Sequence, residues 1–151
     1  KDCIGDWHVN YSKYKYDSAL MFAYRDDIYV VSRRNVDGTM AKAPGWLSQN
    51  IREKLNLIKY WLTTKKTALF RLDKATMELQ HVMDFPSTGD TAFPGIVQMD
   101  ENSFLLMNYS SNIHDINRNW FSGQLGKTYI YWTMSKFTEE EDVSKLPAAP
   151  R

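Results

Sequence analysis

Residues 17–34 read DSALMFAYRDDIYVVSRR, two apolar runs on either side of the polar trio Arg25-Asp26-Asp27. The runs 19–24 and 28–33 are rich in the branched and aromatic residues that β-strands favour. Two such runs joined by a short polar loop are typical of a β-hairpin. The stretch therefore predicts two antiparallel strands and sets the pattern for the rest of the chain.

The same strand pattern recurs after this first hairpin. Two further hairpins and a last single strand are predicted: residues 67–72 with 79–85, residues 93–99 with 104–109, and residues 128–134. Successive hairpins without alternating helices indicate an antiparallel, mainly β fold, which leaves a sandwich, a barrel or a propeller. About seven strands cannot close a propeller ring, because each blade takes four strands in about 40 to 45 residues.

A helical pattern interrupts the strands between the first two hairpins. Leu47, Ile51, Leu55, Ile58 and Leu62 recur at steps of three and four residues, which places them on one face of a helix. Such a stripe is usually a core face. We therefore expect one inserted amphipathic helix whose stripe faces inward, the alternative being a partner-binding or cleft-lining insertion.

The composition is that of an ordinary globular domain, with 151 residues, 43% hydrophobic and 25% charged. Nineteen Lys and Arg against 18 Asp and Glu leave a net charge of +1, so no strong field favours nucleic acid. No apolar run approaches the roughly 20 residues of a membrane-spanning helix. We therefore expect neither a nucleic-acid partner nor a membrane span.

Residues that bind metals and cofactors are sparse. The single cysteine, Cys3, excludes an internal disulfide, and His8, His81 and His114 lie at no metal-ligand spacing. The chain has no phosphate-binding glycine-rich loop, no dinucleotide fingerprint and no Gly-x-Ser-x-Gly elbow. We therefore expect no metal and no cofactor.

Asp90 and the pair Arg33-Arg34 lie where predicted strands begin or end. A carboxylate at a strand entrance can serve a cleft as an acid or base, and the alternative is a local turn in which Asp90 bonds nearby backbone. An arginine can grip a carboxylate through two parallel hydrogen bonds. Adjacent residues of a strand point to opposite faces, so at most one arginine serves a given cleft, and a surface salt bridge is the alternative.

Asn108, Tyr109 and Ser110 close the third hairpin with an amide, a phenol and a hydroxyl, groups that can bind sugar hydroxyls. A tyrosine beside a carboxylate can also act as a nucleophile, and the alternative is a half-buried strand residue. Residues 108–110 and 10–12 also fit the N-glycosylation sequon. The sequons slightly favour a secreted or cell-surface protein.

Ordered motifs along the chain resemble the C-terminal part of sialidase-like (BNR-type) β-propeller proteins: CIGDW at 3–7, DSAL at 17–20, SRRNVDG at 32–38, PSTGDTAF at 86–93 and NYSS at 108–111. Gly89-Asp90-Thr91 with Phe93-Pro94, and Tyr109-Ser110-Ser111 at a strand end, are similar to the segment that opens a later blade in that family and to the strand that follows it. The repeated Ser-x-Asp-x-Gly-x-Thr-Trp turn of that family has only a partial counterpart, with Gln124 for the Asp and Tyr129 for the Trp.

The resemblance implies that residues 1–137 form a partial propeller of about two antiparallel blades, with the N-terminal blades outside this chain. Residues 138–151, acidic and then rich in Pro and Ala, would be a tail. A carbohydrate or another small molecule is the expected ligand, with Asp90 and Tyr109 as catalytic residues and with Arg33 or Arg34, Asn108 and Ser110 as substrate-binding residues. The alternative is a non-catalytic propeller that binds a glycan or protein, or a structural subunit of a larger assembly completed by another chain.

Overall fold

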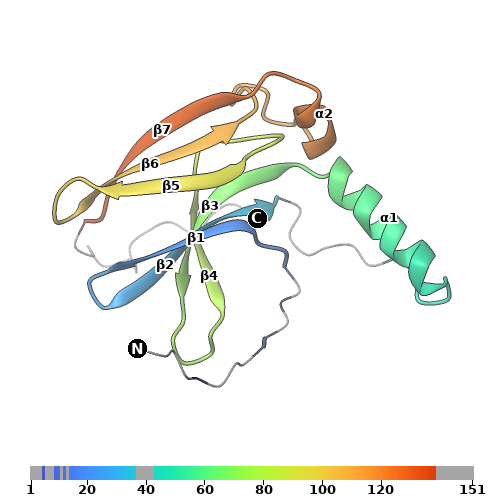
Figure 1. Ribbon diagram of the computed structural model, residues 1–151, viewed down its shortest axis with the longest axis horizontal. Coiled ribbons are helices and arrows are strands. Elements are labelled where there is room, and N and C mark those ends of the chain that lie inside the picture. Colours follow the sequence, from blue (N-terminus) through green and yellow to red (C-terminus); the bar gives the residue numbers. More distant parts are fainter. Residues whose placement is uncertain (1–4, 6–8, 11, 13, 37–42, 139–151) are drawn as a thin grey trace, which may run out of the picture.

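The computed structural model describes residues 5, 9–10, 12, 14–36 and 43–138. Two antiparallel sheets and two helices make up the described part (Figure 1): β1 Asp17–Tyr24, β2 Asp27–Asn35, α1 Gln49–Leu62, β3 Lys65–Leu72, β4 Leu79–Asp84, β5 Ala92–Gln98, β6 Ser103–Ser110, α2 Trp120–Gln124 and β7 Tyr129–Lys136. The mainly β fold is confirmed. The predicted tail lies almost wholly in residues 139–151, outside the described residues.

Each sheet is a meander in which every strand pairs with its neighbours in sequence. The first sheet has the order β1-β2-β3-β4 and the second has the order β5-β6-β7. Met21 lies opposite Val30 and Phe22 opposite Tyr29, so the first predicted hairpin is confirmed. Arg25, in its short loop, has a φ of 51°, a left-handed conformation that suits tight hairpin turns.

The two sheets pack face to face around one apolar core (Figure 1). Val31 and Leu69 of the first sheet and Leu106 of the second are buried there. Aromatic rings close the end of this core, with the ring centres of Tyr24 and Phe137 only 4.3 Å apart. Because side chains alternate along a strand, the opposite face of the first sheet carries a second, smaller cluster around Val30, Ala68 and Phe70.

Helix α1 stands out from the sheets, and it touches them near its C-terminal end (Figure 1). Tyr60 is its one buried residue, whereas Ile51 and Ile58 are each 48% exposed and Leu62 is 60% exposed. The prediction that the apolar stripe faces inward is therefore wrong. Tyr60 lies on the side of the helix opposite the stripe and Trp61 lies at about a right angle to it; both rings contact Trp120, and this contact sets the rotation of the helix.

No helix within the described ranges combines the length and the apolar character needed to cross a membrane.

Candidate functional site

Four strand ends meet at one end of the interface between the sheets. Asp17 begins β1 and pairs with Arg33 near the end of β2. Asp90 lies just before β5, and Tyr109 lies near the end of β6, where it pairs with Ala92. Since neighbouring antiparallel strands run in opposite directions, the start of one strand lies beside the end of the next. Residues far apart in sequence thus reach one place.

Arg33 is the centre of this site. Its Nη2 lies 3.1 Å from Oδ2 of Asp17, and its Nη1 lies 3.6 Å from Oδ1 of Asp90. The Arg33 and Asp90 side chains are only 12% and 11% exposed. The guanidinium carbon lies 5.7 Å from the ring centre of Trp120, a contact favourable to a buried cation. The Nε of Arg33 is buried and has no hydrogen-bond partner among the described residues.

Each of the two carboxylates also accepts a hydrogen bond from a tyrosine hydroxyl. Tyr109 donates to Oδ1 of Asp90 at 3.1 Å, and Tyr60 donates to Oδ2 of Asp17. Arg33, Asp17, Asp90, Tyr60 and Tyr109 are called the Arg33 cluster below. The cluster combines one cation, two carboxylates and two phenols.

The surroundings shift the acidities of this cluster. Burial, and then the negative charge of Asp90, raise the pKa of Tyr109 to about 12. Burial and the hydrogen bond to Asp17 also raise the pKa of Tyr60. Burial alone would raise the pKa of Asp17, but the hydrogen bond from Tyr60 and the charges of Arg33 and Lys15 outweigh it and lower that pKa. At neutral pH both phenols therefore keep their protons, and Asp17 is ionised.

A tightly held loop positions Asp90. Gly89 has a φ of +59°, a left-handed conformation that glycine adopts at little cost. The Asp90 amide donates to Oγ of Ser111 at 3.2 Å, and the Ser111 amide donates back to the Asp90 carbonyl at 3.0 Å. A Cβ at Gly123 in α2 would lie 2.2 Å from the Asp90 nitrogen. The close approach of α2 therefore depends on this glycine.

Asn108 and Ser110 lie beneath the cluster, where they are buried. Nδ2 of Asn108 bonds Oγ1 of Thr91 at 3.3 Å and the Tyr109 carbonyl at 3.2 Å. The Ser110 hydroxyl accepts from the Thr88 amide and donates to the Thr88 carbonyl. Asn108 thus supports the loop beside Tyr109. Since the Ser110 hydroxyl both donates and accepts a hydrogen bond within the chain, its proton is not free for a ligand, and Ser110 is not part of the proposed site.

Arg34 lies on the other face of the first sheet, as the alternation of side chains along β2 requires. Its guanidinium donates two hydrogen bonds to Asp84, at 2.7 and 2.6 Å, and Nε2 of His81 lies 2.9 Å from the same carboxylate. The structure thus brings Arg33, but not Arg34, together with Asp90 and Tyr109.

A cavity of about 320 Å³ lies on that other face, lined in part by Lys15, Arg34, Phe70 and His81. Its two cations are already paired, since Lys15 lies 3.4 Å from Asp17 and Arg34 is held by Asp84. Of the residues that the sequence predicts for the site, Arg34 alone is among the described residues that line this cavity, whereas Arg33, Asp90 and Tyr109 meet in the Arg33 cluster. The Arg33 cluster is therefore the candidate site.

Three residues of the site, Asp17, Tyr60 and Trp120, are given no role in the site by the sequence patterns. Asp17 could have been found, because the predicted first hairpin sets the start of one strand opposite Arg33. Tyr60 and Trp120 lie on helices whose placement no local pattern indicates. Within the described ranges, no three His, Cys, Asp or Glu side chains are grouped closely enough to hold a metal ion.

Comparison of the chain with models of protein families, with curated proteins and with solved structures finds no match. The resemblance to sialidase-like propellers therefore stays a prediction from the sequence motifs.

Proposed function

We propose that this chain is part of a sialidase-like β-propeller in which the Arg33 cluster binds and hydrolyses a glycan. Two features of the fold support the propeller. Each sheet is a meander with its strands in sequence order, as in a propeller blade. The first strands of the two sheets, β1 and β5, lie beside each other, as expected where blades radiate from a common axis.

The hydrogen bond from Tyr109 to Asp90 carries the catalytic part of the proposal. A nucleophile within hydrogen-bond distance of a base is the arrangement that covalent catalysis requires. Because the pKa of Tyr109 is about 12, its proton must leave during the attack, and Asp90 is placed to accept it. Arg33 lies 3.6 Å from the same oxygen of Asp90, so it holds that carboxylate in position.

In the proposed reaction, the Tyr109 oxygen attacks the anomeric carbon while Asp90 takes the phenolic proton. The bond from the anomeric carbon to the leaving oxygen breaks, and that oxygen receives the proton from Asp90. A water molecule then attacks the anomeric carbon while Asp90 takes one of its protons, and the bond from this carbon to the Tyr109 oxygen breaks. Asp90 returns the proton to the phenolate, so that protons and charge balance over the cycle.

An exposed aromatic ring beside the cluster supports a sugar as the ligand. Phe93 is 71% exposed and stacks on Tyr109 with ring centres 5.9 Å apart. Ligand sites commonly combine such apolar faces with a few directed polar groups. The apolar face of a sugar ring can pack on Phe93 while its hydroxyls reach the polar groups of the cluster.

A non-catalytic glycan-binding propeller is the second candidate, and the pairing of Arg33 favours it. Arg33 already contacts Asp17 and Asp90, so little of its charge is left for a substrate carboxylate. This second candidate therefore predicts binding of neutral sugars without turnover.

Hydrolysis of a panel of 4-methylumbelliferyl glycosides, sialic acid and neutral sugars included, tests both candidates. We expect turnover by the wild type and a loss of at least about 100-fold in Asp90→Asn and in Tyr109→Phe, since each removes one partner of the catalytic pair. Tyr129→Phe is the control, because Tyr129 is a 41% exposed tyrosine of β7. Binding to a glycan array without turnover would establish the second candidate, and neither binding nor turnover would refute both.

A further inference from the structure

Helix α1 carries an exposed aliphatic stripe made of Ile51, Leu55, Ile58 and Leu62. Leu55 is partly exposed, and the other three are 48%, 48% and 60% exposed. Their spacing of four, three and four residues is the a/d pattern with which helices pack against one another. An apolar row with that spacing, open to solvent, has the shape of an interaction surface.

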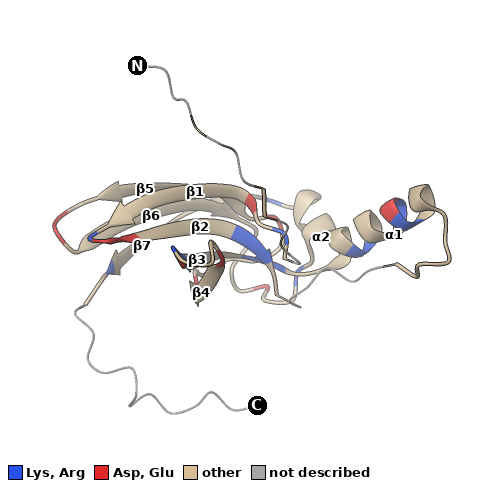
Figure 2. Cartoon of the chain, turned by 90° about the horizontal axis from the view of Figure 1, so that it is seen from below, with Lys and Arg blue, Asp and Glu red and all other residues tan. Residues whose placement is uncertain are grey.

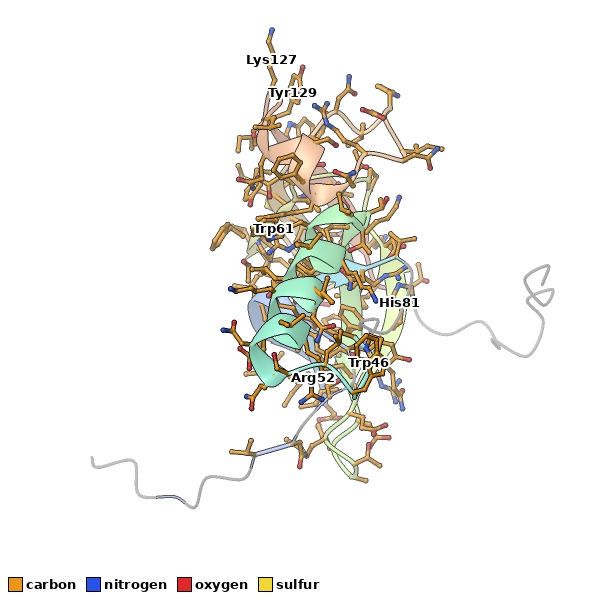
Figure 3. All side chains as sticks on the ribbon, turned by 90° about the vertical axis from the view of Figure 1, so that its right-hand side faces the viewer. Trp46, Arg52, Trp61, His81, Lys127 and Tyr129 are labelled. Carbon is orange, nitrogen blue, oxygen red and sulfur yellow. The ribbon has the colours of Figure 1, made fainter. Side chains whose placement is uncertain are left out.

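The rotation of the helix keeps this stripe turned away from the sheets. Trp61 packs against Trp120 and Phe121, with ring centres 6.3 and 6.5 Å apart, and Tyr60 is buried. Figure 3 shows α1 along the face of the molecule that is turned toward the viewer, with Trp61 toward α2. The aromatic side of the helix is thus used within the chain, and the aliphatic side is left for another molecule.

The charged residues next to the stripe are all basic, and the acidic residue of the helix lies away from it. At 100° per residue, Arg52 and Lys59 follow one border of the stripe and Lys54 follows the other. Glu53, the single acidic residue of α1, lies on the opposite side of the helix. Figure 2 shows this basic character of the helix, with blue positions and one red position.

We propose that the α1 stripe is the docking surface for an acidic amphipathic helix of another protein. The aliphatic row supplies the apolar contact, and the basic borders select a partner with Glu or Asp at its own e and g positions. A second copy of this chain fits less well, because pairing two such helices would bring their basic borders together.

Two synthetic 21-residue peptides test this surface by isothermal titration calorimetry with the full 151-residue chain. Both carry Leu at a and d, and one carries Glu at e and g while its twin carries Lys there. Like charges keep each peptide from pairing with itself. We expect the acidic peptide to bind at low salt at least about tenfold more tightly than the basic twin, and to weaken as salt rises.

Adjacent residues of the helix provide matched variants. Ile58→Gln removes a stripe residue, whereas Leu57→Gln removes an equally exposed leucine, 46% against 48%, that lies about 100° away around the helix. We expect the first variant to weaken binding of the acidic peptide about tenfold or more, and the second to leave it unchanged. The double variant Lys54→Glu/Lys59→Glu should prefer the basic twin.

Several outcomes would overturn the proposal. These are equal binding of the two peptides, equal weakening by Ile58→Gln and Leu57→Gln, and a homodimer in sedimentation that Ile58→Gln abolishes. Binding of the chain to vesicles of phosphatidylglycerol with no binding of the acidic peptide would assign the stripe to an anionic membrane surface instead.

Discussion

At the scale of single residues, the neighbours Arg33 and Arg34 lie on opposite faces of β2 and bind different carboxylates. Arg33 faces the interface between the sheets, where it pairs with Asp17 and Asp90. Arg34 faces the other way and holds Asp84. The alternation of side chains predicts that these neighbours separate. Which of the two reaches the cluster depends on which face of β2 the second sheet covers.

The ionisation of Asp17 predicts a pH dependence of stability. Its pKa is lowered in the folded chain, because the hydrogen bond from Tyr60 and the charges of Arg33 and Lys15 outweigh the effect of burial. A depressed pKa means that the folded state binds the proton less readily than the unfolded state. The stabilisation is therefore present above the ordinary Asp pKa and is lost as the pH falls through the folded pKa.

Urea unfolding of the wild type and of Asp17→Asn between pH 7 and pH 3 checks this prediction. We expect the free energy of unfolding of the wild type to fall more steeply toward pH 3 than that of the variant. The exposed Asp26, changed to Asn, is the control and should follow the wild type. Parallel curves for wild type and Asp17→Asn would contradict the assigned ionisation.

At the scale of elements, the two helices differ in what holds them. The apolar stripe of α1 has the spacing of a core face, yet the aromatic contacts of Tyr60 and Trp61 orient the helix. Helix α2 is short, with Asn119 accepting a hydrogen bond from the Ser122 amide at its N-terminus. Its Gly123 lies against the loop that carries Asp90. Both helices thus serve the site through contacts that their own sequence patterns do not indicate.

Gly123→Ala should displace the Asp90 loop. The new Cβ would lie 2.2 Å from the Asp90 nitrogen and 2.9 Å from the Gly89 carbonyl carbon, and backbone atoms cannot swing aside. We expect a loss of about 1 to 3 kcal/mol in the free energy of unfolding, together with weaker glycan binding or turnover.

Gly126→Ala is the matched control for this prediction, because the three atoms nearest to its Cβ would all belong to the guanidinium group at the end of the Arg118 side chain. Thermal unfolding of both variants measures the difference. Equal unfolding temperatures for the two variants would show that the contact between α2 and the loop is not tight.

At the scale of the whole molecule, the core between the sheets joins strands from both meanders. Leu106 is 1% exposed and packs with Val31 and Leu69 of the other sheet. Phe104 and Phe22 also meet across this interface, with ring centres 5.2 Å apart. The Arg33 cluster lies at the end of the same interface, so its geometry depends on how the sheets are held together.

Leu106→Ala should therefore destabilise the fold by about 2 to 5 kcal/mol, because it leaves a cavity in a packed core. Leu62→Ala removes the same atoms from a 60% exposed position of α1 and should change the free energy of unfolding by less than about 0.5 kcal/mol. Urea unfolding of both variants provides the comparison. A similar loss in the two would mean that the α1 stripe is covered in solution.

The sequence by itself determined the strands, the hairpins and the loops that join them. Strand propensity and alternation are local properties, and the turn at Arg25 lies where the polar trio interrupts the apolar runs. The sequence also identified Asp90, Tyr109 and the arginine pair as polar groups at strand ends. Only the tertiary structure decided that Arg33 rather than Arg34 joins them, that Asp17 and Tyr60 complete the cluster, and that the α1 stripe faces outward. The physical reason is that these contacts join residues far apart in sequence, and the packing of one element against another determines them, which no local pattern records.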